Sequence, residues 1–136
     1  MSKYVSFETV FTNGKALMDA LNAIGMTGIQ NHIDKPVQMN DYFGKPSNRY
    51  ADILVPKSGT KGAYTALGFF RNTKGQYEAV VDDMDLRRYN KDWNNNLKVE
   101  YSEAETKAKL KAEGYVLVNT GINKLNGNRK YEYHQI

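Results

Sequence analysis

Residues Gly68–Asp85 read GFFRNTKGQYEAVVDDMD, and this stretch decides the fold. Runs of aromatic and β-branched residues lie on both sides of Arg71–Gly75, whose Asn, Thr, Lys and Gly are typical of a turn. The stretch therefore predicts a β-hairpin, with one strand within Ala63–Phe70 and the other at Gln76–Val81. Such a hairpin belongs to a mostly antiparallel sheet.

The hairpin ends in three carboxylates, and these have two interpretations. As a metal site, Asp82, Asp83 and Asp85 would supply oxygen ligands, but neighbouring residues of a strand point to opposite faces. Alternatively, Asp83 or Asp85 caps a short helix that starts near Leu86. The pattern favours the structural interpretation, and the metal site stays as the alternative.

The N-terminal part predicts a strand followed by a helix. Lys3–Phe11 alternates between more and less apolar positions, as a half-buried strand does. Thr12 or Asn13 can cap a helix that runs through Ile24, and Gly25 suits the left-handed residue beyond its end. The apolar positions with helical spacing are Ala16, Leu17, Ala20, Leu21 and Ile24.

The middle of the chain is less regular. In Met26–Asn48, Ile29, Ile33, Val37 and Met39 fit one or two strands, although proline and glycine interrupt the pattern. We expect an exposed loop within residues 35–46. Tyr50–Val55 reads as one strand ended by Pro56, and Ser58–Gly62 (SGTKG) reads as a turn. This turn lacks the Gly-Lys-Ser/Thr ending of a phosphate-binding Walker loop, although its backbone donors can hold a phosphate weakly.

A second helix is predicted near the C-terminus. Leu86–Asn96 is polar and rich in Asn, and we expect a short helix or loop there that crosses the sheet. Ser102 with Glu105 matches a capping box, so the helix is expected to begin at Ser102 and to end before Gly114.

The last elements are a strand at Tyr115–Val118, a two-residue turn at Asn126–Gly127 and a strand within Arg129–Ile136. With 136 residues the chain fits a single domain, 1–136. The order of elements predicts an α+β fold: a two-layer sandwich of a mostly antiparallel sheet with two main helices on one face.

Composition excludes several classes of protein. There is no cysteine, so disulfides, zinc–thiolate sites and cysteine nucleophiles are absent. A net charge of +4 modestly favours an anionic partner, although a charge of this size on a small domain mostly serves solubility. No run is long and apolar enough to span a bilayer. The N-terminus lacks the features of a signal peptide, and we expect a cytoplasmic protein. His32 and His134 lack metal-ligand spacing, and no cofactor is expected.

One segment combines cations with aromatic rings. Arg87, Arg88 and Lys91 alternate with Tyr89 and Trp93. Arg and Lys can hold phosphates or carboxylates while an aromatic face stacks on a base, so these five residues are the predicted ligand-binding site. The structural alternative is that Trp93, the sole tryptophan, anchors a loop to the core.

Six short motifs follow one another along most of the chain: Met1–Tyr4, Ala16–Ile24, Ala51–Ile53, Gly68–Phe69, Tyr77–Asp82 and Gly114–Tyr115. In this order they resemble the DUF1257 family, which includes Ycf35-like proteins of chloroplasts and cyanobacteria and relatives in bacteria and phages. The resemblance implies a similar fold and compartment and a bacterial or phage source, but no activity, because the role of that family is not established. The sequence departs from the family pattern at Lys3, where a histidine is usual, and at Asp83–Leu86, where an aromatic-glycine segment is usual.

Three functional hypotheses follow. The leading one is a non-enzymatic binding protein for an anionic partner, namely a nucleic acid, a nucleotide-like ligand or an acidic surface of a host protein, which a phage would use as an antagonist of a host system. The second is a metal-dependent enzyme acting on phosphoesters, with the three aspartates on the ion and Lys74 or Arg87 on the substrate. The third is a homo-oligomeric assembly protein that pairs through the Tyr131–Tyr133 edge of its C-terminal hairpin.

Overall fold

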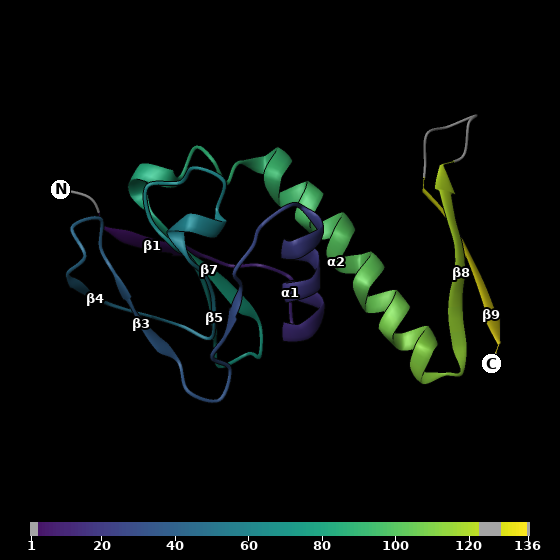
Figure 1. The fold of residues 1–136 in the computed structure, drawn as a ribbon. Helices are drawn as coiled ribbons and strands as arrows, with labels where there is room; N and C mark the ends of the chain where they lie inside the picture. The colour runs from purple at the N-terminus through teal and green to yellow at the C-terminus, as the bar shows by residue number, and fades with distance from the viewer. Residues whose placement is uncertain (1–2, 123–128, 136) are drawn as a thin grey trace.

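The structure is a computed structural model that describes residues 3–122 and 129–135. These residues form two α-helices, one five-stranded sheet and two separate two-stranded hairpins, arranged as in Figure 1. The strands are β1 (Tyr4–Phe7), β2 (Gln30–Asn31), β3 (Val37–Asn40), β4 (Pro46–Ala51), β5 (Ile53–Val55), β6 (Leu67–Arg71), β7 (Tyr77–Asp82), β8 (Tyr115–Ile122) and β9 (Arg129–Gln135). The helices are α1 (Gly14–Ala23) and α2 (Lys91–Ala112), with short 3-10 helices η1 (Lys57–Gly59) and η2 (Asp83–Asp85).

The predicted hairpin is confirmed, and it forms the centre of the main sheet. The strand order is β1-β7-β6-β5-β2, with every neighbouring pair antiparallel. Between β6 and β7, Asn72 Oδ1 accepts hydrogen bonds from the backbone N–H groups of Lys74 (2.9 Å) and Gln76 (3.1 Å), and Gly75 has a φ of 80°. The asparagine and the glycine therefore close the turn as their chemistry requires.

The main core lies between this sheet and the helices. Leu17 and Leu21 of α1 are fully buried in one cluster with Phe69 of β6 and with alternate residues of β7, among them Ala79 and Val81. The α+β fold with the helices covering one face of an antiparallel sheet is thereby confirmed. The predicted start and end of α1 are also correct, because Asn13 Oδ1 accepts from the N–H of Ala16 at 3.0 Å and Gly25 has a φ of 97°.

The predicted start of α2 is wrong. The helix begins at Lys91, eleven residues before Ser102, and Asn90 Oδ1 caps it by accepting from the Trp93 N–H at 2.9 Å. It therefore absorbs most of the segment expected to be a separate short helix or loop. Glu105 does not close a capping box but accepts a hydrogen bond from the Tyr101 hydroxyl at 2.8 Å. The predicted end is correct, since Gly114 follows the helix with a φ of 93°.

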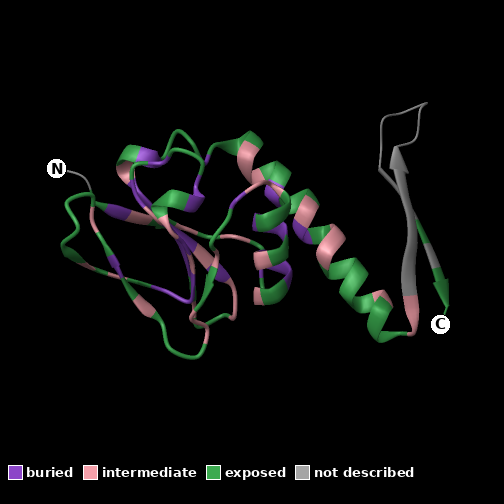
Figure 2. Cartoon of the chain, in the orientation of Figure 1, coloured by how far each residue is buried: buried purple, intermediate pink, exposed green. Residues whose placement is uncertain are grey.

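Tyr101 fastens α2 to the beginning of α1. Its buried ring contacts Phe11, with 4.7 Å between the centroids. Its hydroxyl accepts hydrogen bonds from the N–H groups of Thr12 (3.1 Å) and Asn13 (3.0 Å). Beyond Tyr101, Ala104 is partly buried against the core, but none of the residues of α2 from Ser102 onward is fully buried (Figure 2).

The strand offered by Val37 and Met39 is present as β3, and the β3–β4 hairpin packs on the other face of the sheet. Met39 and Ala51 are buried there against Tyr4 and Val80. Gly68 permits this contact, because a Cβ atom at that position would lie 2.6 Å from the Met39 sulfur. The hairpin is therefore a second cover for the sheet, which the sequence pattern did not indicate.

The single strand predicted at Tyr50–Val55 is two strands, β4 and β5, separated by Asp52. Ala51 pairs with β3, whereas Ile53 pairs with β2 and β6. The buried Asp52 carboxylate accepts a hydrogen bond from the N–H of Arg71 at 2.6 Å. This aspartate holds the point where the chain passes from one sheet to the other.

The C-terminal strands β8 and β9 pair with each other and lie beyond the end of α2, apart from the main sheet (Figure 1). The predicted turn at Asn126–Gly127 lies outside the described residues, and pairing through the β9 edge stays a prediction. Within the described ranges, no helix has the length and apolar character needed to cross a membrane.

Gly59 offers a test of how the turn after β5 is seated. A Cβ atom at Gly59 would lie 1.8 Å from the backbone oxygen of Thr27, whose N–H bonds to the Gly59 oxygen at 3.1 Å. We expect Gly59→Ala to lower the free energy of unfolding by about 1–3 kcal/mol in urea denaturation, because the backbones must separate. Ser58→Ala, at an exposed neighbour, is the control. Equal midpoints for the two variants would contradict the contact.

Candidate functional site

Asp85, at the acidic end of the β6–β7 hairpin, has a structural role. Its carboxylate is buried and accepts three hydrogen bonds from the segment before β6. Tyr64 N–H donates to Oδ1 at 2.9 Å, and Thr65 donates to Oδ2 from its N–H at 3.1 Å and from its hydroxyl at 2.7 Å. The side chain therefore fastens two distant segments together, which is a structural role.

The other two carboxylates point elsewhere. Asp82 is buried, and its Oδ1 caps η2 by accepting from the Met84 N–H at 2.9 Å. The prediction that Asp83 or Asp85 caps a helix starting near Leu86 is wrong, because both residues lie inside η2 and the next described helix begins at Lys91. Asp83 instead accepts a hydrogen bond from the Lys3 N–H at 3.2 Å. Among the residues that the structure describes, no group of three His, Cys, Asp or Glu side chains has the arrangement of a metal site.

Replacing Asp85 tests its structural role. In Asp85→Asn, one oxygen becomes an N–H₂ group, so at least one of the three donors loses its acceptor. We expect a loss of about 1–3 kcal/mol in the free energy of unfolding, measured by denaturant titration. The effect should not depend on added Mg²⁺ or Mn²⁺. Stabilisation of the wild-type protein alone by either ion would contradict the structural assignment.

Asp82 differs from Asp85 in its hydrogen bonding. Both carboxylate oxygens of Asp85 accept hydrogen bonds, whereas Oδ2 of Asp82 is buried without a hydrogen-bond partner. Burial raises the pKa of Asp82 above 3.8, and the neighbouring Asp83 adds to this shift. The folded state therefore holds the proton more tightly than the unfolded chain. This carboxyl contributes stability below pH 3.8 and loses that contribution as the pH rises through the folded pKa.

For Asp82→Asn we accordingly expect a higher Tm than wild type at pH 7, with a difference that shrinks as the pH is lowered toward 3. The amide oxygen can still cap η2, and the substitution removes a buried charge. Thermal melts between pH 3 and pH 7 measure this. A variant less stable than wild type at pH 7 would show that the charged form has a favourable partner.

Four of the five predicted binding residues line one hollow of about 410 Å³, which we call the basic pocket. Three cationic side chains lie in its wall, and no carboxylate does. The cations come from the turn after η1 and from the segment between η2 and α2. The lining residues are Ile24, Met26, Thr60, Lys61, Arg87, Arg88, Tyr89, Asn90 and Trp93.

Lys61 is the member that sequence reasoning missed. It belongs to the SGTKG turn and has a left-handed backbone, with a φ of 65°. Its ammonium group passes over Gly25, where a Cβ atom would lie 2.3 Å from Nζ. This position is just beyond the C-terminal end of α1, where the helix dipole favours a cation. Gly25 therefore ends α1 and also makes room for a cation of the pocket.

The two arginines have different parts. Arg88 Nη2 donates to the backbone oxygens of Lys61 (3.0 Å) and Thr60 (3.4 Å), so this guanidinium holds the Lys61 turn in place. Arg87 is exposed. In the described part of the chain, neither arginine nor Lys61 forms an ion pair with a carboxylate. Arg87 and Lys61 are the cations best placed for a ligand.

The aromatic residues form the wall of the basic pocket. Tyr89 is buried, and its ring contacts Trp93 edge-to-face, with centroids 4.7 Å apart and an interplanar angle of 69°. Burial raises the pKa of Tyr89 to about 12. Trp93 is half-buried and packs against the main core, as the structural alternative expected. The exposed part of the Trp93 ring can contact a ligand, whereas the buried Tyr89 ring packs against Trp93.

Lys91 lies outside the basic pocket. It lines a neighbouring hollow of about 560 Å³, which we call the Lys91 hollow. Residues two apart on an α-helix point roughly 200° away from each other, so Lys91 and Trp93 lie on different sides of α2. The lining residues are Phe7, Glu8, Thr9, Val10, Phe11, Gln76, Lys91, Asn94, Asn95 and Lys98.

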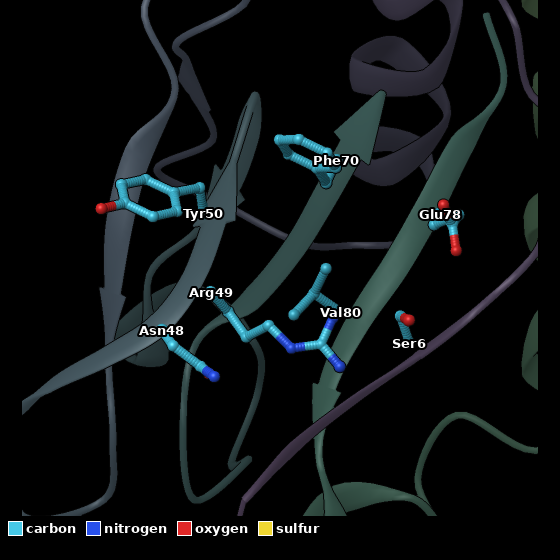
Figure 3. A pocket seen from close by; sticks show the side chains of 7 residues that line it. All are labelled: Ser6, Asn48, Arg49, Tyr50, Phe70, Glu78 and Val80. Atoms are coloured by element: carbon cyan, nitrogen blue, oxygen red, sulfur yellow. The ribbon is translucent and has the colours of Figure 1, made fainter. Parts of the chain in front are cut away.

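A third hollow, the Arg49 hollow, lies on the opposite face of the main sheet beside β4 (Figure 3). Its volume is about 280 Å³, and the Arg49 side chain extends toward Val80 and Ser6 (Figure 3). Arg49 Nη2 donates to the backbone oxygen of Tyr4 at 3.5 Å, which is a weak hydrogen bond. Its lining holds one cation and one carboxylate, Glu78, so it has no excess charge.

One exposed aromatic group also went unpredicted. Tyr42 contacts Phe43 and Tyr64 edge-to-face, with centroids 5.3 Å and 6.4 Å apart. Lys57 Nζ lies 5.6 Å from the centre of the Tyr42 ring. The group joins the β3–β4 loop to the segment before β6, a pairing that no local sequence pattern indicates.

Comparison with known proteins gives no match to any protein-family model, curated protein or solved structure. The resemblance to the DUF1257 family therefore stays a prediction. The fold and its hollows define a small α+β protein with a basic pocket.

Proposed function

We propose that this protein is a non-enzymatic binding protein whose anionic ligand is held in the basic pocket. The observation that carries the proposal is the meeting of Lys61, Arg87 and Arg88 in one hollow that no carboxylate lines. Like charges gathered without a counter-charge create a positive potential that favours an anion. The net charge of +4 acts in the same direction.

The chemistry of these groups favours a ligand that carries phosphate. Guanidinium and ammonium groups both bind phosphate oxygens by charge-assisted hydrogen bonds, and Arg87 is free to turn toward one. The volume of about 410 Å³ lies in the usual range of small-ligand sites. Trp93 supplies an apolar edge against which a ring or sugar can rest.

Trp93 is the sole tryptophan of the chain, so its fluorescence reports on this pocket alone. We expect inorganic pyrophosphate to change that fluorescence in a saturable manner. Binding should be at least about tenfold weaker in the double variant Lys61→Gln/Arg87→Gln, because two charge-assisted contacts are lost. The measurement is a titration at low ionic strength, with circular dichroism to verify folding.

The matched control is Lys15→Gln/Lys35→Gln, which removes the same charge at exposed positions outside the three hollows. Wild-type affinity in the control supports a local site. An equal loss in both double variants would reduce the effect to net charge, and the absence of any saturable signal would overturn the proposal.

A further inference from the structure

The basic pocket and the Lys91 hollow lie on either side of the first turns of α2. Asn90 and Trp93 line the pocket, while Lys91, Asn95 and Lys98 line the other hollow. The two linings share no residue, yet Asn90 and Lys91 are consecutive. The two hollows are therefore neighbours, separated by the N-terminal end of α2.

The Lys91 hollow has a composition that suits a nucleotide. Lys91 and Lys98 are exposed and seven residues apart, which places them on one side of α2 with the exposed amide of Asn95 between them. Val10 is 60% exposed and provides an apolar surface. Glu8 is the one carboxylate in this lining, so the cations remain in excess.

The end of α2 connects the two hollows electrostatically. The first N–H groups of an α-helix have no partner within the helix, and the summed peptide dipoles place a partial positive charge there. Asn90 caps one of these groups through the Trp93 N–H, at 2.9 Å. Asp92 is exposed in the first turn, and its carboxylate would repel an anionic chain. Such a chain should therefore cross the helix at Asn90 and Lys91.

We infer that the ligand is a single-stranded nucleic acid that passes from the basic pocket over the start of α2 into the Lys91 hollow. The inference rests on the proposed function and extends it. Together the hollows present five cations: Lys61, Arg87, Arg88, Lys91 and Lys98.

Size favours a strand over a mononucleotide. An α-helix with its side chains is about 10–12 Å across, so a ligand that occupies both hollows must be longer than a single nucleotide. Single strands also expose the faces of their bases, which can rest on Trp93 and Val10, whereas a duplex hides them. Concave sites on two sides of a narrow helix suit a flexible strand better than a stiff duplex.

The test is a length series of oligothymidylates, from dTMP to an octamer, followed by Trp93 fluorescence. For the wild type we expect the octamer to bind at least about tenfold more tightly than dTMP, because each added charge-assisted contact strengthens binding. The slope of log K against log salt should approach about −3.5 for five phosphate contacts to a single strand.

The variant that isolates the inference is Lys91→Gln/Lys98→Gln. It should bind dTMP as the wild type does, lose most of the gain shown by the octamer, and have a salt slope shallower by about 1.4. Lys61→Gln/Arg87→Gln should weaken both ligands. Lys15→Gln/Lys35→Gln should leave both unchanged.

The outcomes separate the inference from the proposed function. Equal affinities for dTMP and the octamer, with no effect of the Lys91→Gln/Lys98→Gln variant, would overturn the strand and leave the pocket. Failure of pyrophosphate, dTMP and the octamer alike would overturn both. Tighter binding of a duplex or of polyglutamate than of the octamer would also overturn the inference, in favour of duplex nucleic acid or an acidic protein.

Discussion

The carboxylate of Asp85 is the interaction on which the arrangement of the basic pocket depends. It accepts hydrogen bonds from Tyr64 and Thr65 and thereby holds the segment before β6 against the end of β7. Lys61 precedes this segment, and Arg87 and Arg88 follow Asp85 by two and three residues. A single buried acceptor therefore brings together the two pieces of chain that carry the cations.

In the basic pocket, backbone carbonyl groups and a helix dipole, instead of carboxylates, hold two of the cations in place. Arg88 donates to the oxygens of Thr60 and Lys61, and the Lys61 ammonium lies beside the negative end of the α1 dipole. These are partial charges, weaker than a carboxylate, so they position the cations without neutralising them. A positive potential remains for a ligand. Departures from electrostatic balance of this kind are expected at functional sites.

The features that the sequence predicted well are those fixed by neighbouring residues. The β6–β7 turn follows from Asn72 and Gly75, and α1 follows from Asn13 and Gly25, because each signal acts within a few residues. The prediction of where α2 starts was wrong for a physical reason. Ser102 and Glu105 satisfy the local rule for a cap, but burial of Leu97 and Tyr101 against α1 makes the helix continue through them.

The site was predicted only in part, again for reasons of distance along the chain. Arg87, Arg88, Tyr89 and Trp93 were recognised because they are close in sequence, and all four line the basic pocket. Lys61 is brought to them by tertiary contacts, and Lys91 is turned away by the helix. The burial of Tyr89, which makes it a support for Trp93, also depends on tertiary packing.

The same packing explains why the candidate surface lies at the start of α2 and not along its length. Leu97 and Tyr101 are buried and anchor the first three turns to the core, and the Tyr101 hydroxyl accepts hydrogen bonds from the N–H groups of Thr12 and Asn13. Both hollows draw their helical residues from this anchored part. From Ser102 onward α2 has no buried residue and contributes to neither hollow. A binding surface gains from a fixed backbone, because ordering a mobile segment on binding costs free energy, and the anchored turns are already ordered in the folded protein.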